Sequence, residues 1–276
     1  MMRLFLAIAI WAPFGVSAQT TPRQVRLSFS GGDPRTAITI TWSSDSAATQ
    51  AVRFGVATTD ENEIESETTA PLDGGLGVIH SAVLQDLDPG TIYKYRVGSD
   101  DDGFAPESGA FEFTTAPEDP CAPFVFVALG DTRGLPYLDF LPNALSNWPD
   151  VFDRVAADNP SLVLIAGDLV EDGSNLDQWN SFFNQGTDHY TRIPVMPSFG
   201  NHDTGGGGTG HYYEDLFALP TNAQGTEAYY AFTFGNVLFV AFNTEEPGAD
   251  DDFEEQALWL EATLAQTPAT WKIIFF

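Results

Sequence analysis

The chain has 276 residues, of which 43% are hydrophobic and 18% charged, and its 11 basic and 39 acidic residues give a formal net charge of −28. This size and composition indicate a globular protein with a large core and favour two domains over one. The acidic surface argues against nucleic acid or an anionic membrane as a partner held by surface charge. An anionic ligand would need local positive charge, which bound metal ions can supply.

The first 18 residues have the organisation of a secretory signal peptide. Arg3 precedes a short apolar run, and the stretch ends in small residues at Ser17 and Ala18. We expect cleavage after Ala18, and therefore a secreted or periplasmic protein. A membrane anchor is the alternative, but the run is shorter than the roughly 20 apolar residues that a spanning helix needs, and no later stretch qualifies. The single cysteine, Cys121, excludes an intrachain disulfide.

Residues 22–116 are predicted to form an all-β sandwich. Alternating apolar and polar residues indicate short strands at 37–42, 51–56 and 111–115. A Pro-Gly turn followed by a strand with two tyrosines, Tyr93 and Tyr95, resembles the tyrosine corner of fibronectin type III domains. No residue set here suggests catalysis: Trp42 is expected in the core, and His80 on the surface or as core filling.

Residues 117–123, which contain three prolines, are predicted to be a linker, and residues 124–276 a layered α/β domain. In this second domain continuous apolar runs, typical of strands buried on both faces, alternate with stretches of helical spacing. The expected strands are 124–129, 162–166, 195–199, 237–242 and 271–276. The expected helices are 148–157, 176–183 and 253–264, and Gly235 and Asn236 form a tight hairpin after a strand at 229–234.

Three of these strands, in succession, end in a glycine followed by a side chain that can bind metal. The pairs are Gly130-Asp131, Gly167-Asp168 and Gly200-Asn201, and the three ligand positions are 37 and 33 residues apart. Each gap has the length of one strand-helix-strand crossover, so the three side chains are expected at one edge of a parallel sheet, where ligands gather in such folds. Any one pair alone also suits an ordinary strand-end turn.

This constellation predicts a centre that binds two metal ions and acts on a phosphate. Asp168 is the natural bridging ligand, with Asp131 on one ion and Asn201 on the other, and paired ions can activate a bridging hydroxide. His202 is expected to contact the phosphate and to protonate the leaving oxygen, with Asp203 orienting its ring.

The motifs Gly130-Asp131, Gly167-Asp168 and 200–203 (Gly-Asn-His-Asp) resemble the first three motifs of the calcineurin-like metallophosphoesterases. The upstream sandwich resembles the arrangement of purple acid phosphatases. The resemblance implies a four-layer sandwich, a dinuclear site of iron, zinc or manganese, and hydrolysis of phosphoesters.

Two positions depart from the family pattern. Purple acid phosphatases have a tyrosine three residues after the second aspartate, where this chain has Glu171. Other members have a histidine two residues after the first aspartate, where this chain has Arg133. Glu171 is either a substitute carboxylate or a surface residue. Arg133 is a candidate to bind the substrate phosphate as a bidentate fork, with a plain turn as the alternative.

The family also supplies histidines on later strands, and no histidine follows position 211 here. The resemblance therefore predicts a C-terminally truncated chain with an incomplete metal site. His189 is expected on the far side of the sheet, and His211 on the surface or within reach of the substrate.

The expected function is that of an exported phosphoesterase that hydrolyses phosphomonoesters with a metal-activated hydroxide. Two alternatives stay open: a phosphodiesterase of the same superfamily, and a noncatalytic secreted binding protein with a degenerate site.

Overall fold

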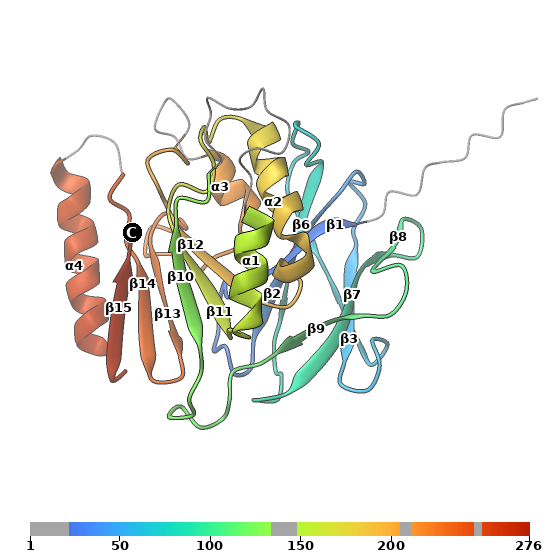
Figure 1. Cartoon of the computed structure of the whole chain (residues 1–276), viewed down its shortest axis with the longest axis horizontal. Coiled ribbons are helices and arrows are strands. Elements are labelled where there is room, and N and C mark those ends of the chain that lie inside the picture. Colours follow the sequence, from blue (N-terminus) through green and yellow to red (C-terminus); the bar gives the residue numbers. More distant parts are fainter. Residues whose placement is uncertain (1–21, 134–147, 205–210, 246–249) are drawn as a thin grey trace, which may run out of the picture.

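The computed structural model describes residues 22–133, 148–204, 211–245 and 250–276 (Figure 1). The predicted signal peptide, residues 1–18, lies outside the described residues. No helix in these ranges is both long and apolar enough to cross a membrane.

The N-terminal part is an all-β sandwich of two sheets, as the sequence predicts. One sheet has the strand order β1–β2–β6–β5 and the other β4–β3–β7–β8, with β9 paired to β7. The strands are β1 (Arg23–Ser28), β2 (Ile38–Ser44), β3 (Ala51–Gly55), β4 (Asn62–Glu65), β5 (Glu67–Thr68), β6 (Val78–Leu84), β7 (Ile92–Ser99), β8 (Gly103–Ala105) and β9 (Phe111–Thr114).

Aromatic side chains fill the sandwich, and the predicted tyrosine corner is present. The hydroxyl oxygen of Tyr93 accepts a hydrogen bond from the backbone N–H of Asp88 at 2.9 Å. Trp42 is fully buried, and its indole N–H donates to Gln50 at 2.6 Å. His80 stacks on Trp42 and is also fully buried, so it is a core residue.

The described residues of the second part form two three-stranded sheets and four helices. Strands β10 (Phe126–Gly130), β11 (Leu162–Ala166) and β12 (Val195–Ser198) are parallel neighbours. Strand β14 (Val237–Ala241) pairs with β13 (Tyr230–Phe234) in a hairpin and with β15 (Trp271–Phe275) in parallel. The helices are α1 (Trp148–Ala157), α2 (Leu176–Tyr190), α3 (His211–Leu216) and α4 (Asp250–Gln266).

These elements form layers, which confirms the predicted layered α/β fold. Figure 1 shows α4 outside the sheet of β13–β15, and α1 and α2 on the opposite side of the sheet of β10–β12. The two sheets face each other, since Phe126 of β10 packs edge-on against Phe239 of β14 with ring centroids 5.1 Å apart. On the outer side, the amide of Gln256 in α4 bonds to the backbone carbonyl of Asn243 just after β14.

The expectation that all the apolar strands are buried on both faces is wrong for two of them. The central strands β11 and β14 are buried as expected, but β10 and β15, each at one end of its sheet, are partly exposed; β12, at the other end of the β10–β12 sheet, is buried. Trp271 of β15 is 64% exposed. An apolar run shows that a strand can be buried, but it does not show which other elements of the fold cover its faces and edges.

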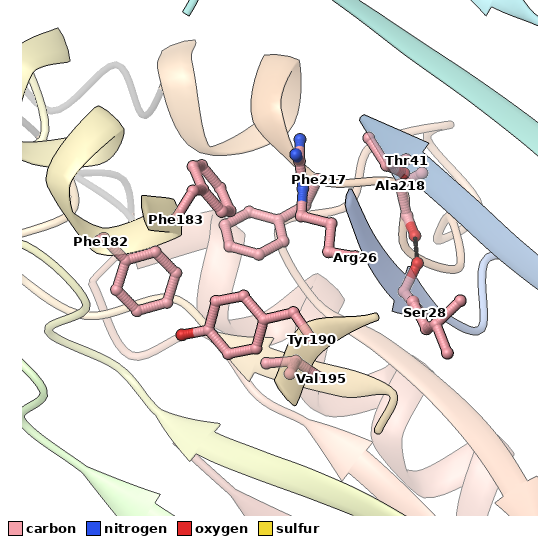
Figure 2. Close-up of a pocket in the computed structure, with 10 residues that line it drawn as sticks. Arg26, Ser28, Thr41, Phe182, Phe183, Tyr190, Val195, Phe217 and Ala218 are labelled. Carbon is pink, nitrogen blue, oxygen red and sulfur yellow. Dashed lines mark hydrogen bonds between the residues drawn. The ribbon is translucent and has the colours of Figure 1, made fainter. Parts of the chain in front are cut away.

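The sandwich and the α/β part share a continuous buried junction. Arg26 of β1 is 4% exposed; its guanidinium lies 4.1 Å from the ring centroid of Phe183 in α2 and donates to the carbonyl oxygen of Leu216. Burial lowers the pKa of Arg26 to about 9. Figure 2 shows the surrounding rings, among them Phe217 and Tyr190, which line a cavity of about 10 Å³. A cavity of this size holds about one water molecule and is too small for a substrate.

A half-buried carboxylate before β13 gives the fold a pH dependence. Burial raises the pKa of Glu227 to about 8, and the charge of Glu214 adds to this shift. The folded protein therefore keeps this proton up to about pH 8, whereas the unfolded chain loses it near 4.5. Between these values the folded state binds more protons, so this group lowers the free energy of unfolding as pH rises.

We expect Glu227→Gln, which is neutral at every pH, to match the wild type near pH 5. Near pH 8 it should be more stable by on the order of 2 kcal/mol, because the wild type must either take up a proton or bury a charge when it folds, and the variant does neither. Thermal unfolding of both proteins across this range measures the difference. A difference in melting temperature that stays constant with pH would contradict the assignment.

Candidate functional site

Asp131, Asp168 and Asn201 emerge at the same edge of the β10–β11–β12 sheet. In the register of these parallel strands Gly130 lies beside Ala166, and Ala166 beside Ser198. Asp131, Asp168 and Asn201 follow these aligned residues by one, two and three positions in the sequence. The structure therefore brings the three predicted ligand positions to one place, at the carboxyl ends of the strands.

The backbone at these strand ends is strained. Asp131 and Asp168 have φ angles of 52° and 54°, in the left-handed region that few non-glycine residues adopt. Gly167 has a φ of 63°, and a Cβ on Gly200 would lie only 2.1 Å from the backbone nitrogen of Asp168. Such conformations cost free energy and cluster at functional sites, where the surrounding structure holds them in place.

The Asp168 carboxylate is the most enclosed of the predicted ligands. Its side chain is 12% exposed, whereas that of Asp131 is 71% exposed. Oδ1 of Asp168 accepts a hydrogen bond from the backbone N–H of His202 at 3.0 Å. Oδ2 lies 3.4 Å from Nε of Arg133. The two oxygens of Asp168 thus face different neighbours, the 200–202 turn and Arg133.

His202 is oriented by Glu171 and not by Asp203, which corrects the expected pairing. Nδ1 of His202 lies 2.7 Å from the backbone carbonyl oxygen of Glu171 and 3.6 Å from its carboxylate Oε1. A carbonyl oxygen can only accept a hydrogen bond, so Nδ1 carries the hydrogen in the neutral ring. Nε2 is then the ring atom that can exchange a proton with a ligand.

Asp203 holds the backbone of the two neighbouring loops together. Its carboxylate accepts hydrogen bonds from the N–H groups of Leu169 at 2.8 Å, Val170 at 3.2 Å and Gly200 at 3.0 Å. The residue is 1% exposed, and burial raises the pKa of its carboxyl to about 7 against the opposing effect of these donors. Asp203 thereby fixes the position of the turn that carries Asn201 and His202.

Arg133 points into a group of three carboxylates. Its Nε lies 3.6 Å from Oδ1 of Asp131 and 3.4 Å from Oδ2 of Asp168, and its Nη1 lies 3.2 Å from Oε2 of Glu171. The backbone N–H of Arg133 also donates to the carbonyl oxygen of Asp168 at 3.1 Å. The sequence showed Arg133 and Glu171 only as two separate departures from the family pattern; the structure shows that they contact each other.

Of the other two histidines of this part, the structure describes the side chain of His189 only. His189 lies at the end of α2, where its Nε2 is 2.7 Å from Asp153 and its ring stacks on Phe152. Its place on the far side of the sheet is as predicted. His211 begins α3, and its side chain lies outside the described residues.

The donor set fits the implied metal centre in part. Carboxylate oxygens of Asp131 and Asp168 and the amide oxygen of Asn201 are hard ligands of the kind that such metal ions accept. In the ranges that the structure describes, however, no group of three or more His, Cys, Asp or Glu side chains is arranged to hold a metal ion. The cation that Asp131 and Asp168 both face is the guanidinium of Arg133. The residues therefore fit an ion on the Asn201 side of Asp168 better than one beside Asp131.

Both parts of the chain match families of known proteins. The family description "Purple acid Phosphatase, N-terminal domain" matches residues 22–115, and "Calcineurin-like phosphoesterase" matches residues 124–276. Purple acid phosphatase 23 of Arabidopsis thaliana is 27% identical over 235 residues, covering 71% of this chain and 47% of the relative. Purple acid phosphatase 15 of the same plant is 28% identical over 230 residues, covering 71% and 41%. The chain thus spans less than half the length of these two relatives.

A solved structure shows the same fold. Purple acid phosphatase PPD1 from yellow lupin (Lupinus luteus) seeds superposes with a TM-score of 0.70 at 18% identity, covering 92% of this chain and 50% of that one. Identity this low supports the fold alone. The match of the second part, from residue 124 to residue 276, covers more than half of the chain, and the chain therefore belongs to the calcineurin-like phosphoesterase family.

Proposed function

We propose that the protein is an exported, metal-dependent phosphoesterase that hydrolyses phosphomonoesters. The observation that carries the proposal is the convergence of Asp131, Asp168 and Asn201 at the carboxyl ends of three adjacent parallel strands. Membership of the calcineurin-like phosphoesterases and the similarity to purple acid phosphatases support the reaction class. The predicted signal peptide, residues 1–18, supports export to the periplasm or the medium.

Asp131, Asp168 and Asn201 would hold the metal, for which iron, zinc and manganese are the candidates. When bound, the metal supplies Lewis-acid activation of water and stabilises charge on the phosphoryl group. The enclosed carboxylate of Asp168 is held between the His202 backbone and Arg133, which limits its freedom to reorient. The side chain of Asp131 is mostly exposed, so its carboxylate is accessible to a ligand from solvent.

Arg133 and His202 would handle the substrate. The guanidinium of Arg133 has more donors than its three carboxylate contacts use, and it can present the remaining N–H groups to phosphate oxygens. His202 Nε2 would donate a proton to the leaving oxygen, while the carbonyl oxygen of Glu171 keeps Nδ1 protonated. Asp203 acts on the position of His202 through the backbone of the turn.

The activity test starts from the protein stripped of metal and reloaded with manganese, zinc or iron. We expect release of p-nitrophenol from p-nitrophenyl phosphate to exceed that from bis(p-nitrophenyl) phosphate. A preference for the diester would instead support the phosphodiesterase alternative. Absence of turnover with both esters after reloading would refute the phosphoesterase proposal.

His202→Ala should slow substrates with poor leaving groups more than p-nitrophenyl phosphate. A poor leaving group needs the proton, so we expect a loss of about 10²-fold or more in kcat for an alkyl phosphate. The loss for p-nitrophenyl phosphate should be much smaller, because p-nitrophenolate leaves without help. Steady-state rates over a series of leaving groups measure the contrast, and an equal loss across the series would exclude His202 as the proton donor.

A noncatalytic binding protein is the second candidate, and the position of Arg133 between the carboxylates favours it. Elemental analysis of the purified protein separates the two candidates, because a tightly held metal is not expected of a degenerate site. Absence of bound metal after reloading, together with absence of turnover, would support the binding protein.

A further inference from the structure

The two residues that depart from the family pattern form one ion pair beside the predicted metal ligands. Nη1 of Arg133 lies 3.2 Å from Oε2 of Glu171, and Nε of Arg133 lies within 3.6 Å of both Asp131 and Asp168. Backbone contacts fix this arrangement: the N–H of Arg133 donates to Asp168 O, and the hydroxyl of Thr132 donates to Leu169 O at 3.2 Å. Contacts of both the side chain and the main chain of Arg133 therefore hold the guanidinium beside the carboxylates.

A guanidinium in this position competes with a metal ion for the same oxygens. An ion held by Asp131 and by Oδ2 of Asp168 would lie close to the fixed positive charge of Arg133, and like charges at such a distance repel. The charge of Arg133 is delocalised over a planar guanidinium that is fixed against these carboxylates. The guanidinium of Arg133 therefore already occupies the cation position on the side of Asp168 that faces Asp131.

The opposite side of Asp168 has different neighbours. Its Oδ1 accepts from the N–H of His202 at 3.0 Å, and a Cβ on Gly200 would lie 2.5 Å from this oxygen. Asn201, with its amide, stands between these two residues in the turn. An ion on this side would find Oδ1 of Asp168, the carboxylate oxygen for which no contact with the guanidinium is seen, and Asn201 is the residue of the neighbouring turn that can offer an amide oxygen.

The charges near Asp168 favour the same division. The three carboxylates that Arg133 contacts, those of Asp131, Asp168 and Glu171, carry three formal negative charges, and Arg133 carries one positive charge. One divalent ion balances the remaining two negative charges, whereas two divalent ions would leave an excess of two positive charges before any substrate binds.

We propose that Arg133, held by Glu171, replaces one of the two ions that the family resemblance implies. The centre then binds a single divalent ion, on the side of Asp168 and Asn201, and Arg133 supplies the second positive charge next to it. This inference rests on the proposed metal-dependent function but assigns a different number of ions. Glu171 is a positioning residue in this account, because it acts through Arg133.

The test is the number of manganese ions bound per protein chain. The protein is stripped with a chelator, dialysed against Mn²⁺ and analysed for metal content, and the Mn²⁺ electron paramagnetic resonance spectrum is recorded on the same sample. We expect one ion per chain and the spectrum of isolated Mn²⁺. Two ions with a spin-coupled spectrum would overturn this inference and leave the proposed function intact, whereas absence of bound ions would overturn both.

Variants of Arg133 show whether its charge excludes the second ion. Arg133→Gln removes the charge and should raise the content to two ions per chain, while Arg133→Lys keeps the charge and should stay at one. Arg192→Gln is the matched control, because Arg192 bonds to His189 on the far side of the sheet and should leave one ion. If Arg133→Gln does not fold, Arg133→Met serves instead, because it also removes the guanidinium charge and keeps an unbranched side chain, and it should likewise raise the content to two ions. A content of one ion in these charge-removing variants would contradict the proposal.

Discussion

Asp168→Asn should abolish metal binding and phosphoester hydrolysis together. The substitution keeps the size of the side chain but removes its negative charge. In the wild type this carboxylate faces both Arg133 and the 200–202 turn. An amide is a weaker metal ligand than a carboxylate, and its N–H₂ group would oppose either the guanidinium or the N–H of His202. We expect kcat/KM to fall by about 10³-fold or more, which corresponds to ~4 kcal/mol of transition-state stabilisation.

The measurement pairs metal content with the rate of p-nitrophenyl phosphate hydrolysis. Asp177→Asn is the matched control, because it is the same chemical substitution at an exposed position in the first turn of α2. The control should retain both metal and activity. An Asp168→Asn protein that keeps either one at the wild-type level would remove Asp168 from its assigned role.

Gly200→Ala should disrupt the site through packing alone. A Cβ at this position would lie 2.1 Å from the backbone nitrogen of Asp168 and 2.5 Å from its Oδ1, far inside van der Waals contact. The turn that carries Asn201 and His202 would have to move away from Asp168. We expect a destabilisation of about 1–3 kcal/mol and a loss of activity of roughly 10²-fold, because small displacements of catalytic groups are costly.

Thermal unfolding and steady-state kinetics measure the two effects of Gly200→Ala. Gly31→Ala is a suitable control, since a Cβ on Gly31 would meet nothing within 4 Å. The control should change neither melting temperature nor rate. Wild-type kinetics in Gly200→Ala would show that the close contact with Asp168 does not position the site.

The sequence predicted the strand ends because they follow a simple local rule. A buried apolar run, a glycine and then a polar ligand describe β11 with Gly167 and Asp168, and the same rule finds Asp131 and Asn201. The rule works because each strand and its exit turn lie within one short stretch of sequence. Parallel strands then place their carboxyl ends at one edge of the sheet.

Long-range contacts were beyond the sequence pattern. The role of Asp203 depends on backbone N–H groups of Leu169 and Val170, more than 30 residues earlier in the chain. The pair of Arg133 and Glu171 likewise joins two different loops. Local spacing suggested that Asp203 orients its neighbour His202, but the carboxylate is turned toward the buried loop instead.

The junction between the two parts was also missed. A proline-rich segment at 117–123 indicated a linker, which is normally found between separate domains. The structure instead buries Arg26 of β1 against Phe183 of α2, and the hydroxyl of Tyr95 donates to the carbonyl oxygen of Thr191 at 2.7 Å. Sequence alternation shows which residues of a strand are buried but not which distant element buries them.

The most direct test of the metal-dependent phosphoesterase account is the rate of p-nitrophenyl phosphate hydrolysis as Mn²⁺ is titrated into metal-free protein. We predict that the metal-free protein has no activity, that the rate rises in proportion to bound metal, and that a chelator reverses the rise. Hydrolysis by the metal-free protein, or its absence at saturating metal, would contradict the account.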